Sequence, residues 1–308
     1  MKKNINYSFI IPHKNTPNLL IRCVKSIPTR NDIEIIIVDD NSSPNIVDFK
    51  QFPCSTFKNV KVIFDKSSKG AGHARNIALP LITGKWAVFA DSDDFFNACF
   101  NDILNEYTNS EADIIYFNAN SVDSETFEPS HRADHLHEFF NIYKSDHNKG
   151  DNIFKFLFSE PWCKICRKSI IINNNIRFDE TIIDEDVIFS YTIGFYAKKI
   201  CIDEREGYCV TSRKGSLCQG LSEDKIFCRF IIAAKWAKFL KDNNIQLEIK
   251  NFTYMLYNFS RNLYKDKKTF RKQYCALQKI NYKKRYIWKI IAKNIWFTIK
   301  IKMHFFEF

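Results

Sequence analysis

The sequence predicts an α/β fold with a parallel, doubly wound sheet. Short apolar runs typical of strands alternate with segments of helical spacing through the first two thirds of the chain. Two of the runs, residues 33–38 and 86–90, pass directly into carboxylates. With 308 residues, 45% of them hydrophobic, the chain can bury the large core that such a sheet needs.

The first elements each follow from a local pattern. Residues 7–12 are apolar and rich in β-forming side chains, and the turn that follows offers Thr16 or Asn18 as a helix cap. Apolar residues at helical spacing predict a helix over residues 19–27, which Pro28 ends. Further strands are predicted over residues 33–40, 60–64, 86–91 and 112–119, and helices over residues 70–81 and 97–109.

The middle of the chain is more polar. Residues 121–150 hold His131, His135, His137 and His147, and we interpret this stretch as a solvated loop. His131 and His135 are spaced i, i+4 and could bind a metal if the segment were helical. Beyond it, helices are predicted over residues 151–158 and 187–196, the second opened by the acidic residues 184–186, and short strands over residues 199–202 and 208–211.

The C-terminal part has helical periodicity and carries the charge of the chain. Helices are predicted over residues 225–240 and 252–264, with a last segment beyond residue 280. Residues 261–308 hold 14 Lys and Arg against 2 Asp and Glu, whereas the rest of the chain has a net charge of −1. Lysines interleaved with Trp288 and Trp296 suit a helix on an anionic membrane, or one that packs on the domain with its lysines in water.

The ten cysteines are scattered through predicted strands and helices, as is typical of reduced, buried thiols in a cytoplasmic protein. Cys163 and Cys166 have the C-x-x-C spacing, but a zinc site would need a second such pair. The sequence has no signal-peptide pattern and no long uncharged apolar span. We therefore expect neither secretion nor a membrane-spanning helix.

Residues 86–94 are the most informative stretch, because an apolar run ends there in Asp91, Asp93 and Asp94. Carboxylates this close repel one another unless a cation joins them. Proteins bind Mn²⁺ or Mg²⁺ in this way, through one or two carboxylates together with substrate phosphates. The alternative is a helix start capped by Asp94, which leaves Asp91 unexplained.

Polar residues at other strand ends are predicted to converge on the same crevice. Pro12 and Asn15 follow the first strand, and Asp39 and Asp40 close the second. Asp39 is an acceptor suited to the ring or ribose donors of a nucleotide. These residues predict a nucleotide-binding edge of the sheet.

A glycine-opened helix start follows at residues 69–76, with Gly72 near its beginning and Arg75 one turn on. A helix N-terminus and an arginine both suit phosphate. The spacing matches neither the dinucleotide-binding pattern nor the P-loop, so both of those folds are disfavoured.

Four motifs in this order resemble the family 2 glycosyltransferases, which have the GT-A fold: FIIPxxN from residue 9, EIIIVDDNS from residue 34, GAGxARN from residue 70 and GKWAVFADSDD from residue 84. The resemblance covers about the first 110 residues, and residues 161–168, 176–178 and 185–186 are similar to the acceptor half of bacterial polysaccharide members. It implies a GT-A domain with a mixed sheet over residues 1–220, made of a donor-binding half (1–110) and an acceptor half (111–220), followed by a helical, basic region (221–308).

The same resemblance implies an inverting, metal-dependent transfer of a sugar from a nucleotide-sugar, with a UDP-sugar favoured, to a glycan or lipid-linked acceptor in bacterial surface polysaccharide synthesis. Carried over by motif, Asp39 contacts the base, Asp91 the ribose, and Asp93 the Mn²⁺ or Mg²⁺ on the diphosphate. Asp186 is the catalytic base, for which a helix cap is the alternative. The other donor-side residues are Pro12, Asn15, Asp40, Gly72 and Arg75, and the acceptor-side residues are Glu185 and Trp162.

Three positions need comment. Trp162 could stack on a sugar ring or belong to the core. Lys14 stands where the family usually has an aromatic residue, and it could reach phosphate or be solvated. Asn41 replaces a common glycine, and we expect it to adopt the same left-handed backbone conformation.

Two other functions share some of these features. A nucleotidyltransferase needs a glycine-rich phosphate loop after the first strand, where this chain has His13-Lys14-Asn15. A non-catalytic, basic lipid- or nucleic-acid-binding protein would carry its basic residues at the pocket, whereas here they lie far along the chain from the acidic centre. We expect no nucleic-acid partner, and a cytoplasmic location with the basic tail available to an anionic inner membrane face.

Overall fold

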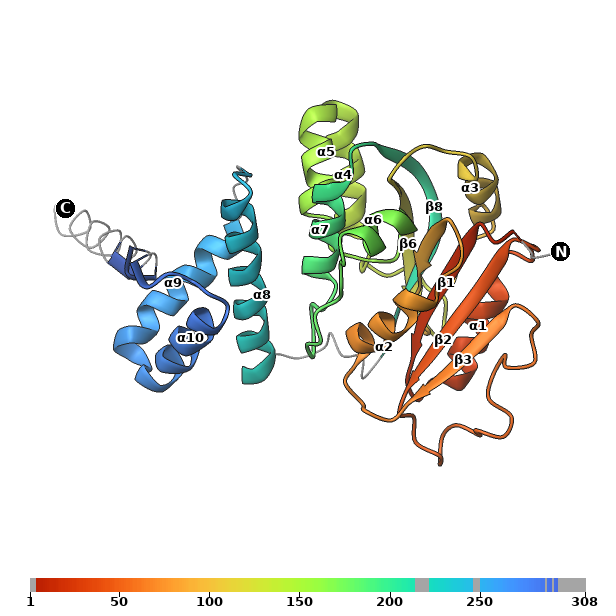
Figure 1. Ribbon diagram of the computed structural model, residues 1–308, viewed down its shortest axis with the longest axis horizontal. Coiled ribbons are helices and arrows are strands. Elements are labelled where there is room, and N and C mark those ends of the chain that lie inside the picture. The colour runs from red at the N-terminus through yellow and green to blue at the C-terminus, as the bar shows by residue number, and fades with distance from the viewer. Residues whose placement is uncertain (1–3, 214–221, 246–249, 286, 290, 293–308) are drawn as a thin grey trace. The chain divides into compact units, whose positions relative to one another are not determined.

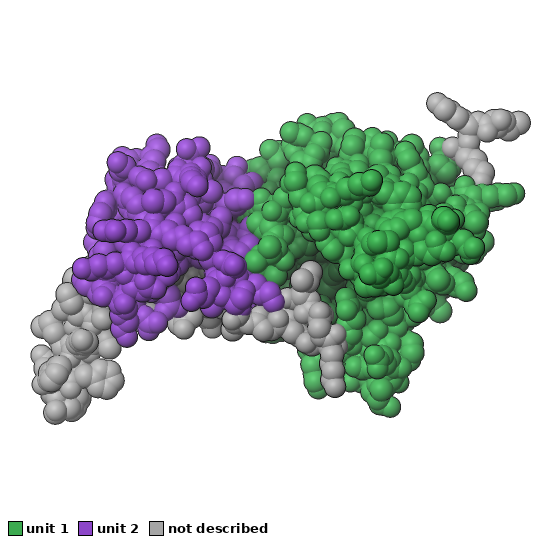
Figure 2. Space-filling model, turned by 90° about the horizontal axis from the view of Figure 1, so that it is seen from below, with its two compact units in different colours: residues 1–219 green, residues 220–308 purple. Residues whose placement is uncertain are grey.

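The computed structural model describes residues 4–213, 222–245, 250–285, 287–289 and 291–292. The chain forms two compact units, residues 1–219 and residues 220–308, which are coloured separately in Figure 2. The first unit contains the sheet and the second is helical (Figure 1).

The first unit is built on one sheet with helices around it. Its strands are β1 (Tyr7–His13), β2 (Ile33–Asp40), β3 (Val60–Asp65), β4 (Trp86–Phe89), β5 (Phe95–Phe96), β6 (Ile114–Asp123), β7 (Lys164–Arg167) and β8 (Ile200–Ser212). Its helices are α1 (Pro17–Ser26), α2 (Ala71–Ala78), the 3₁₀ turn η1 (Leu79–Leu81), α3 (Phe100–Tyr107), α4 (Asp134–Ser145), α5 (His147–Phe156), α6 (Lys168–Asn173) and α7 (Val187–Tyr196).

The sheet is mixed, in the order β3-β2-β1-β4-β7-β6-β8-β5. The first four strands are parallel, β7 runs antiparallel to both of its neighbours, and β6 and β8 are again parallel. Strand–helix alternation alone predicted a parallel sheet, which is wrong for β7 and for the β5–β8 pair. The mixed sheet implied by the family resemblance is confirmed. The pair of helices α4 and α5 precedes β7, so the chain re-enters the sheet in the opposite direction.

The core lies between the sheet and its helices, with α2 packed on β1 and β2 (Figure 1). Helix α1 packs against β5. Every residue of β1 and β4 is buried, because both strands are central and covered on both faces. Trp86 and Tyr7 are among its largest fully buried side chains. The carboxyl ends of β1, β2 and β4 therefore meet at one edge of a rigid layer.

Strand β8 is one long strand, where two short ones were predicted. Its pairing with β6 is interrupted by a bulge: from Phe117 to Ala119 β6 advances by 2 residues, while β8 advances by 5, from Asp203 to Tyr208. The polar residues of this bulge separate the two apolar runs that sequence patterning read as separate strands.

The prediction of a solvated loop over residues 121–150 was wrong, because α4 and α5 lie there. Leu136 and Phe140 lie one turn apart on α4 and are buried, which gives the helix an apolar anchor. His131 precedes α4 and pairs with Asp134, while His135 pairs with Glu160. Among the described residues, no group of three His, Cys, Asp or Glu could hold a metal ion by itself.

The remaining differences in the first unit are local. Thr16 precedes α1 but makes no side-chain cap, because its hydroxyl hydrogen-bonds to Ser92 instead. Asn41 has a φ of 58°, so the expected left-handed conformation is confirmed. The nine cysteines in the described part of the chain are all free thiols, and six of them are buried.

The second unit contains α8 (Glu223–Asp242), α9 (Lys250–Lys265) and α10 (Lys267–Lys279). Its core includes Phe230, Phe259, Ile287 and Ile291. Helix α10 was not predicted, because its lysines mask the apolar side of the helix. Ile287 and Ile291 pack in this core, which agrees with a basic segment that packs on the domain as far as residue 292. Residues 293–308, including Trp296, lie outside the described residues. No helix in the described chain is both long and apolar enough to span a membrane.

Candidate active site

The acidic turn, residues 91–94, follows β4 and is held in place by β8. Asp94 N donates to Asp91 O across the turn (3.1 Å), and Asp91 N donates to the Tyr208 hydroxyl (2.9 Å). Thr211 donates through its N–H to Asp94 Oδ1 (2.7 Å) and through its hydroxyl to Asp93 O (2.8 Å). The turn continues into β5 rather than into a helix, so Asp94 does not cap a helix as the alternative required.

The carboxylates of the acidic turn create a concentrated negative charge. Burial raises the pKa of Asp94 well above its ordinary value, and the nearby Asp93 and Asp91 raise it further. Burial also raises the pKa of Asp91, although Arg75 acts in the opposite direction. A site with these properties favours a bound cation.

Asp91 and Asp93 can each offer an oxygen to such a cation. Within the described residues, Asp91 uses Oδ1 for Arg75 and Asp93 uses Oδ2 for Arg213 (2.9 Å), which leaves the second oxygen of each for another ligand. Their side chains are 34% and 23% exposed. Two hard oxygen donors fit Mn²⁺ or Mg²⁺, which take the rest of their ligands from substrate and water.

Arg75 joins the acidic turn to the segment before α7. Its Nη2 donates to Asp91 Oδ1 (2.6 Å) and its Nη1 donates to Glu185 Oε1 (2.9 Å). The residue is only 2% exposed, and its guanidinium lies over the Phe178 ring. Its charge is therefore already paired inside the protein, and the phosphate contact expected from the sequence stays a prediction.

Gly72 allows α2 to approach the same segment. A Cβ at this position would lie 2.1 Å from Asp179 O and 3.0 Å from Glu185 Cβ, so no larger residue fits without moving the backbone. The structure thus gives Gly72 a packing role. Its expected contact with phosphate stays a prediction.

Asp186 stands at the N-terminus of α7, but its side chain makes no capping hydrogen bond. Burial raises the pKa of Asp186 well above its ordinary value, Glu185 raises it further, and Arg75 lowers it. The helix-cap alternative therefore has no support in the geometry. A carboxylate with a raised pKa and no cap to hold it is suited to accept a proton.

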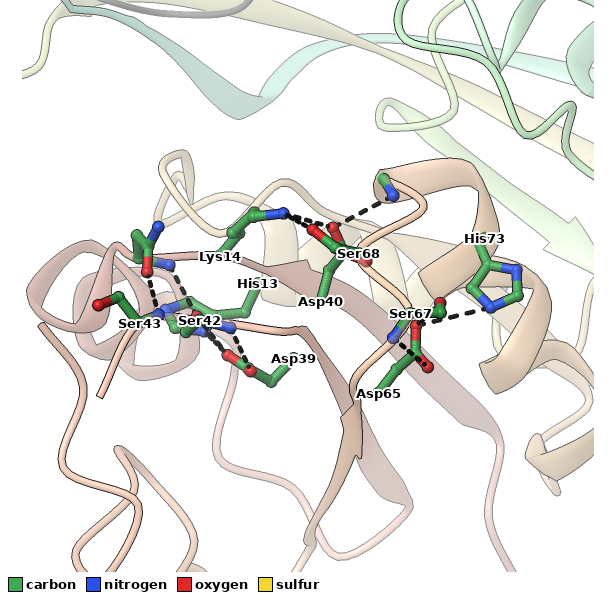
Figure 3. Close-up of polar contacts among 12 residues, drawn as sticks. His13, Lys14, Asp39, Asp40, Ser42, Ser43, Asp65, Ser67, Ser68 and His73 are labelled. Atoms are coloured by element: carbon green, nitrogen blue, oxygen red, sulfur yellow. Dashed lines mark hydrogen bonds and ion pairs between the residues drawn. The ribbon is translucent and has the colours of Figure 1, made fainter. Parts of the chain in front are cut away.

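Asp39 lies near the end of β2, and its carboxylate is hydrogen-bonded by other residues of the protein (Figure 3). It is 1% exposed, and it accepts hydrogen bonds from His13 Nδ1 (2.8 Å) and from Ser42 N (2.9 Å). Thr16 N donates to His13 Nε2 (3.2 Å), which places the imidazole proton on Nδ1. Burial would raise the pKa of Asp39, but the hydrogen bonds from His13 and Ser42 outweigh it and keep the pKa low.

Asn15 fixes the loop that follows β2. Its N–H donates to Ser42 Oγ (2.8 Å) and its Oδ1 accepts from Ser43 N (2.7 Å), with Asn15 itself in the left-handed conformation at φ 57°. Asp39 and Asn15, with the buried Pro12 before them, therefore shape the donor-side edge from within. Their direct contacts with a nucleotide stay predictions.

Lys14 and Asp40 join β2 to the start of α2, as Figure 3 shows. Asp40 Oδ2 accepts from Lys14 Nζ (3.1 Å) and from Gly70 N (3.1 Å). Asp40 is buried, whereas the Lys14 side chain is 43% exposed. Lys14 therefore places a partly exposed cation at the edge where the nucleotide is expected.

Trp162 belongs to the core. It is 7% exposed and stacks on Tyr208 with ring centroids 5.4 Å apart. This geometry favours the core alternative over stacking on a sugar. Tyr208, Thr211 and Arg213 are site residues that sequence reasoning missed, since they follow a bulge in a strand whose register no local pattern predicts.

The parallel strands that end in carboxylates, the acidic turn open to a cation and the antiparallel β7 define a GT-A nucleotide-sugar transferase fold. The chain belongs to glycosyl transferase family 2, whose family model matches residues 8–173, more than half of the chain.

Three proteins with similar sequences are also named as glycosyltransferases. The uncharacterized glycosyltransferase YibD of Escherichia coli is 24% identical over 68% of this chain and 62% of its own length. A cholesterol galactosyltransferase of Borreliella burgdorferi is 25% identical over 70% and 62%, so the chain spans about three fifths of these two relatives. A poly(ribitol-phosphate) beta-glucosyltransferase of Bacillus spizizenii is 27% identical over 68% of this chain and 32% of that protein.

Solved structures share the fold. The crystal structure of Staphylococcus aureus TarS in complex with UDP-GlcNAc has a TM-score of 0.61 to this chain and 19% sequence identity. The match covers 90% of this chain and 80% of that one.

Proposed function

We propose that this protein transfers a sugar with inversion from a UDP-sugar to a glycan or lipid-linked acceptor of a bacterial surface polysaccharide, with a divalent metal in the donor site. The single observation that carries the proposal is the link that Arg75 makes between Asp91 of the acidic turn and Glu185, the neighbour of Asp186. This link supports a site in which the acidic turn would bind the metal and Asp186 would accept a proton. The UDP-GlcNAc in TarS and the surface-polymer reaction in the name of the Bacillus relative support the donor and acceptor classes.

The donor side would be formed by the strand ends. Asp93 would hold Mn²⁺ or Mg²⁺, which would supply positive charge to the diphosphate that leaves, and Asp91 would contact the ribose. Asp39 would contact the base behind the edge shaped by Pro12 and Asn15. Lys14, paired with Asp40 and partly exposed, would add a cation on the same side.

The acceptor side would be formed by residues 185 and 186. Asp186 would take the proton from the acceptor hydroxyl as that oxygen attacks the anomeric carbon. The raised pKa of Asp186 makes it a stronger proton acceptor than an ordinary carboxylate. Glu185, whose Oε1 accepts a hydrogen bond from Arg75, would contact the acceptor beside Asp186. The attack comes from the face opposite the leaving diphosphate, which gives inversion.

The second unit would bring the enzyme to an anionic inner membrane face. Trp288 is 52% exposed and Tyr264 is 67% exposed, and Lys283, Lys284 and Lys289 lie near Trp288 in sequence. An aromatic and basic surface of this kind suits lipid headgroups. Co-sedimentation with vesicles of anionic or neutral lipid, comparing wild type with Trp288→Ser, tests this partner.

The reaction class is tested by measuring hydrolysis of UDP-, GDP- and dTDP-sugars with Mn²⁺, in wild type and in Asp93→Asn. We expect slow release of one nucleotide diphosphate that the variant loses. Lys238→Met is a control, because its ion pair with Asp242 is partly exposed and lies within α8 of the second unit, outside the residues of the proposed site. Calorimetry with UDP and Mn²⁺ gives a second readout, and failure of wild type to bind any nucleotide with metal would refute the transferase proposal.

A further inference from the structure

Arg22 of α1 reaches the acidic turn from the helix side, and the reaction proposed above gives it no role. Its Nη2 donates to the main-chain oxygen of Asp93, which also accepts from the Thr211 hydroxyl at 2.8 Å. Its Nη1 donates to Ser124 O at 3.0 Å, in the turn after β6. One guanidinium thus ties α1, the acidic turn and the end of β6 together.

The guanidinium also lies against two neighbouring aromatic rings, Phe95 and Phe127. Its Cζ lies 5.2 Å from the Phe95 ring centroid and 5.7 Å from that of Phe127. Phe127 is 54% exposed and has a positive φ of 60°, so it lies at the surface as a cover over the arginine. Such stacking leaves Arg22 little freedom to move away from the turn.

We propose that Arg22 is a positioning residue that sets the metal affinity of the acidic turn through the Asp93 carbonyl, an inference that rests on the proposed function. Two donors on one carbonyl oxygen prevent the peptide plane from rotating, and a rotation there would swing the Asp93 carboxylate. Arg22 never touches the metal or the donor. Lysine cannot replace it fully, because only the planar guanidinium can make both hydrogen bonds while it stacks on the rings.

The test compares Arg22→Met and Arg22→Lys with Arg167→Met. Arg167 is a matched control, since it donates to Ala112 O (2.9 Å) and Ser110 O (3.0 Å) and lies 4.8 Å from the Trp86 ring centroid, but holds no part of the acidic turn. Calorimetry measures the Kd of Mn²⁺ at saturating UDP and the Kd of UDP without metal. Thermal unfolding reports the loss of stability.

We expect Arg22→Met to weaken Mn²⁺ binding about tenfold or more, the range seen when a partner of a metal ligand is removed, and to leave metal-free UDP binding unchanged. Arg22→Lys keeps the positive charge and should fold more stably than Arg22→Met. Its Kd for Mn²⁺ should lie between those of wild type and Arg22→Met. Arg167→Met should lower the melting temperature without moving the Mn²⁺ Kd. Unchanged Mn²⁺ affinity in both Arg22 variants, or an equal loss in Arg167→Met, would overturn the inference. Failure of wild type to bind Mn²⁺ with UDP would instead overturn the proposed function and this inference with it.

Discussion

Arg75 Nη2 lies 2.6 Å from Asp91 Oδ1, so a residue of α2 neutralises the first carboxylate of the acidic turn. The same guanidinium holds Glu185 at 2.9 Å, next to the proposed base. Two segments that are 94 residues apart in sequence, from residue 91 to residue 185, are therefore fixed by one side chain.

Removing that side chain should destabilise the fold. In Arg75→Met, Asp91 and Glu185 keep their charges without a partner, which costs about 3 kcal/mol, the lower end for breaking a buried pair because both carboxylates are partly exposed. Urea unfolding measures the change. Lys144→Met breaks an exposed pair and should cost no more than about 1 kcal/mol. Equal losses of unfolding free energy in the two variants would contradict a stabilising role of Arg75 between Asp91 and Glu185.

Asp186→Asn should abolish transfer while donor binding survives. The amide is isosteric but cannot accept the acceptor proton, so kcat should fall by about 10²- to 10⁴-fold. Glu180→Gln serves as the control, since Glu180 lies six residues earlier and pairs with His73. If the Asn variant kept wild-type kcat with an unchanged Kd for UDP, another group would be the base.

The pH profile should show the raised pKa of Asp186. The base acts only when deprotonated, so kcat should fall as the pH drops through that pKa, at a higher pH than for an ordinary carboxyl. Arg75 lowers the pKa of Asp186, and therefore Arg75→Met should move the acid limb to still higher pH. Arg75→Lys keeps a positive charge and should move it less. A limb at the same pH in all three proteins would rule out this electrostatic coupling.

Asp94→Asn should make the metal-free protein more stable at pH 7.5. The folded-state pKa of Asp94 lies above its unfolded value, so its charged form is disfavoured in the fold, and stability falls as the pH rises through the window between the two. Asparagine removes that loss and can still accept from Thr211 N. The gain should shrink below the unfolded-state pKa. Asp134→Asn, on an exposed side chain, should show no such pH-dependent gain in urea unfolding.

Two glycines should separate packing from function. A Cβ on Gly150 would lie 2.6 Å from Tyr143 Cα, and one on Gly72 would lie 2.1 Å from Asp179 O. Each alanine variant should lose about 1–3 kcal/mol through overpacking. Gly72→Ala also pushes on the segment that carries Asp186, so it alone should lower kcat well beyond its loss of stability. Equal effects of the two variants on kcat would show that Gly72 affects activity only through the stability of the fold.

Much of the donor half was predictable because its signals are local. Strands β1, β2 and β4 are uninterrupted apolar runs, and the carboxylates that end two of them stand where a buried strand has to stop. The left-handed conformation of Asn41 was also predictable, since asparagine tolerates a positive φ and stands where the family resemblance has a common glycine.

The other half depended on distant contacts. Helix α4 carries apolar residues at helical spacing, among them Leu136, Phe139 and Phe140, but the His- and Asp-rich residues on both sides obscured this signal. Whether Arg75 faces phosphate or carboxylate depends on Glu185, 110 residues away. The inward hydrogen bonds of Asp39 likewise depend on His13 of another strand.

The bulge in β8 makes the site sensitive to the length of the chain in a way that no single side chain reveals. Tyr208 and Thr211 meet the acidic turn only because β8 has gained an odd number of residues on β6 before them. In a strand, one residue more or less turns every following side chain to the opposite face. Deleting a single residue between Asp203 and Tyr208 would thus keep every site residue but turn the side chains of Tyr208 and Thr211 away from the acidic turn. The length of this bulge therefore determines which side chains of β8 face the site.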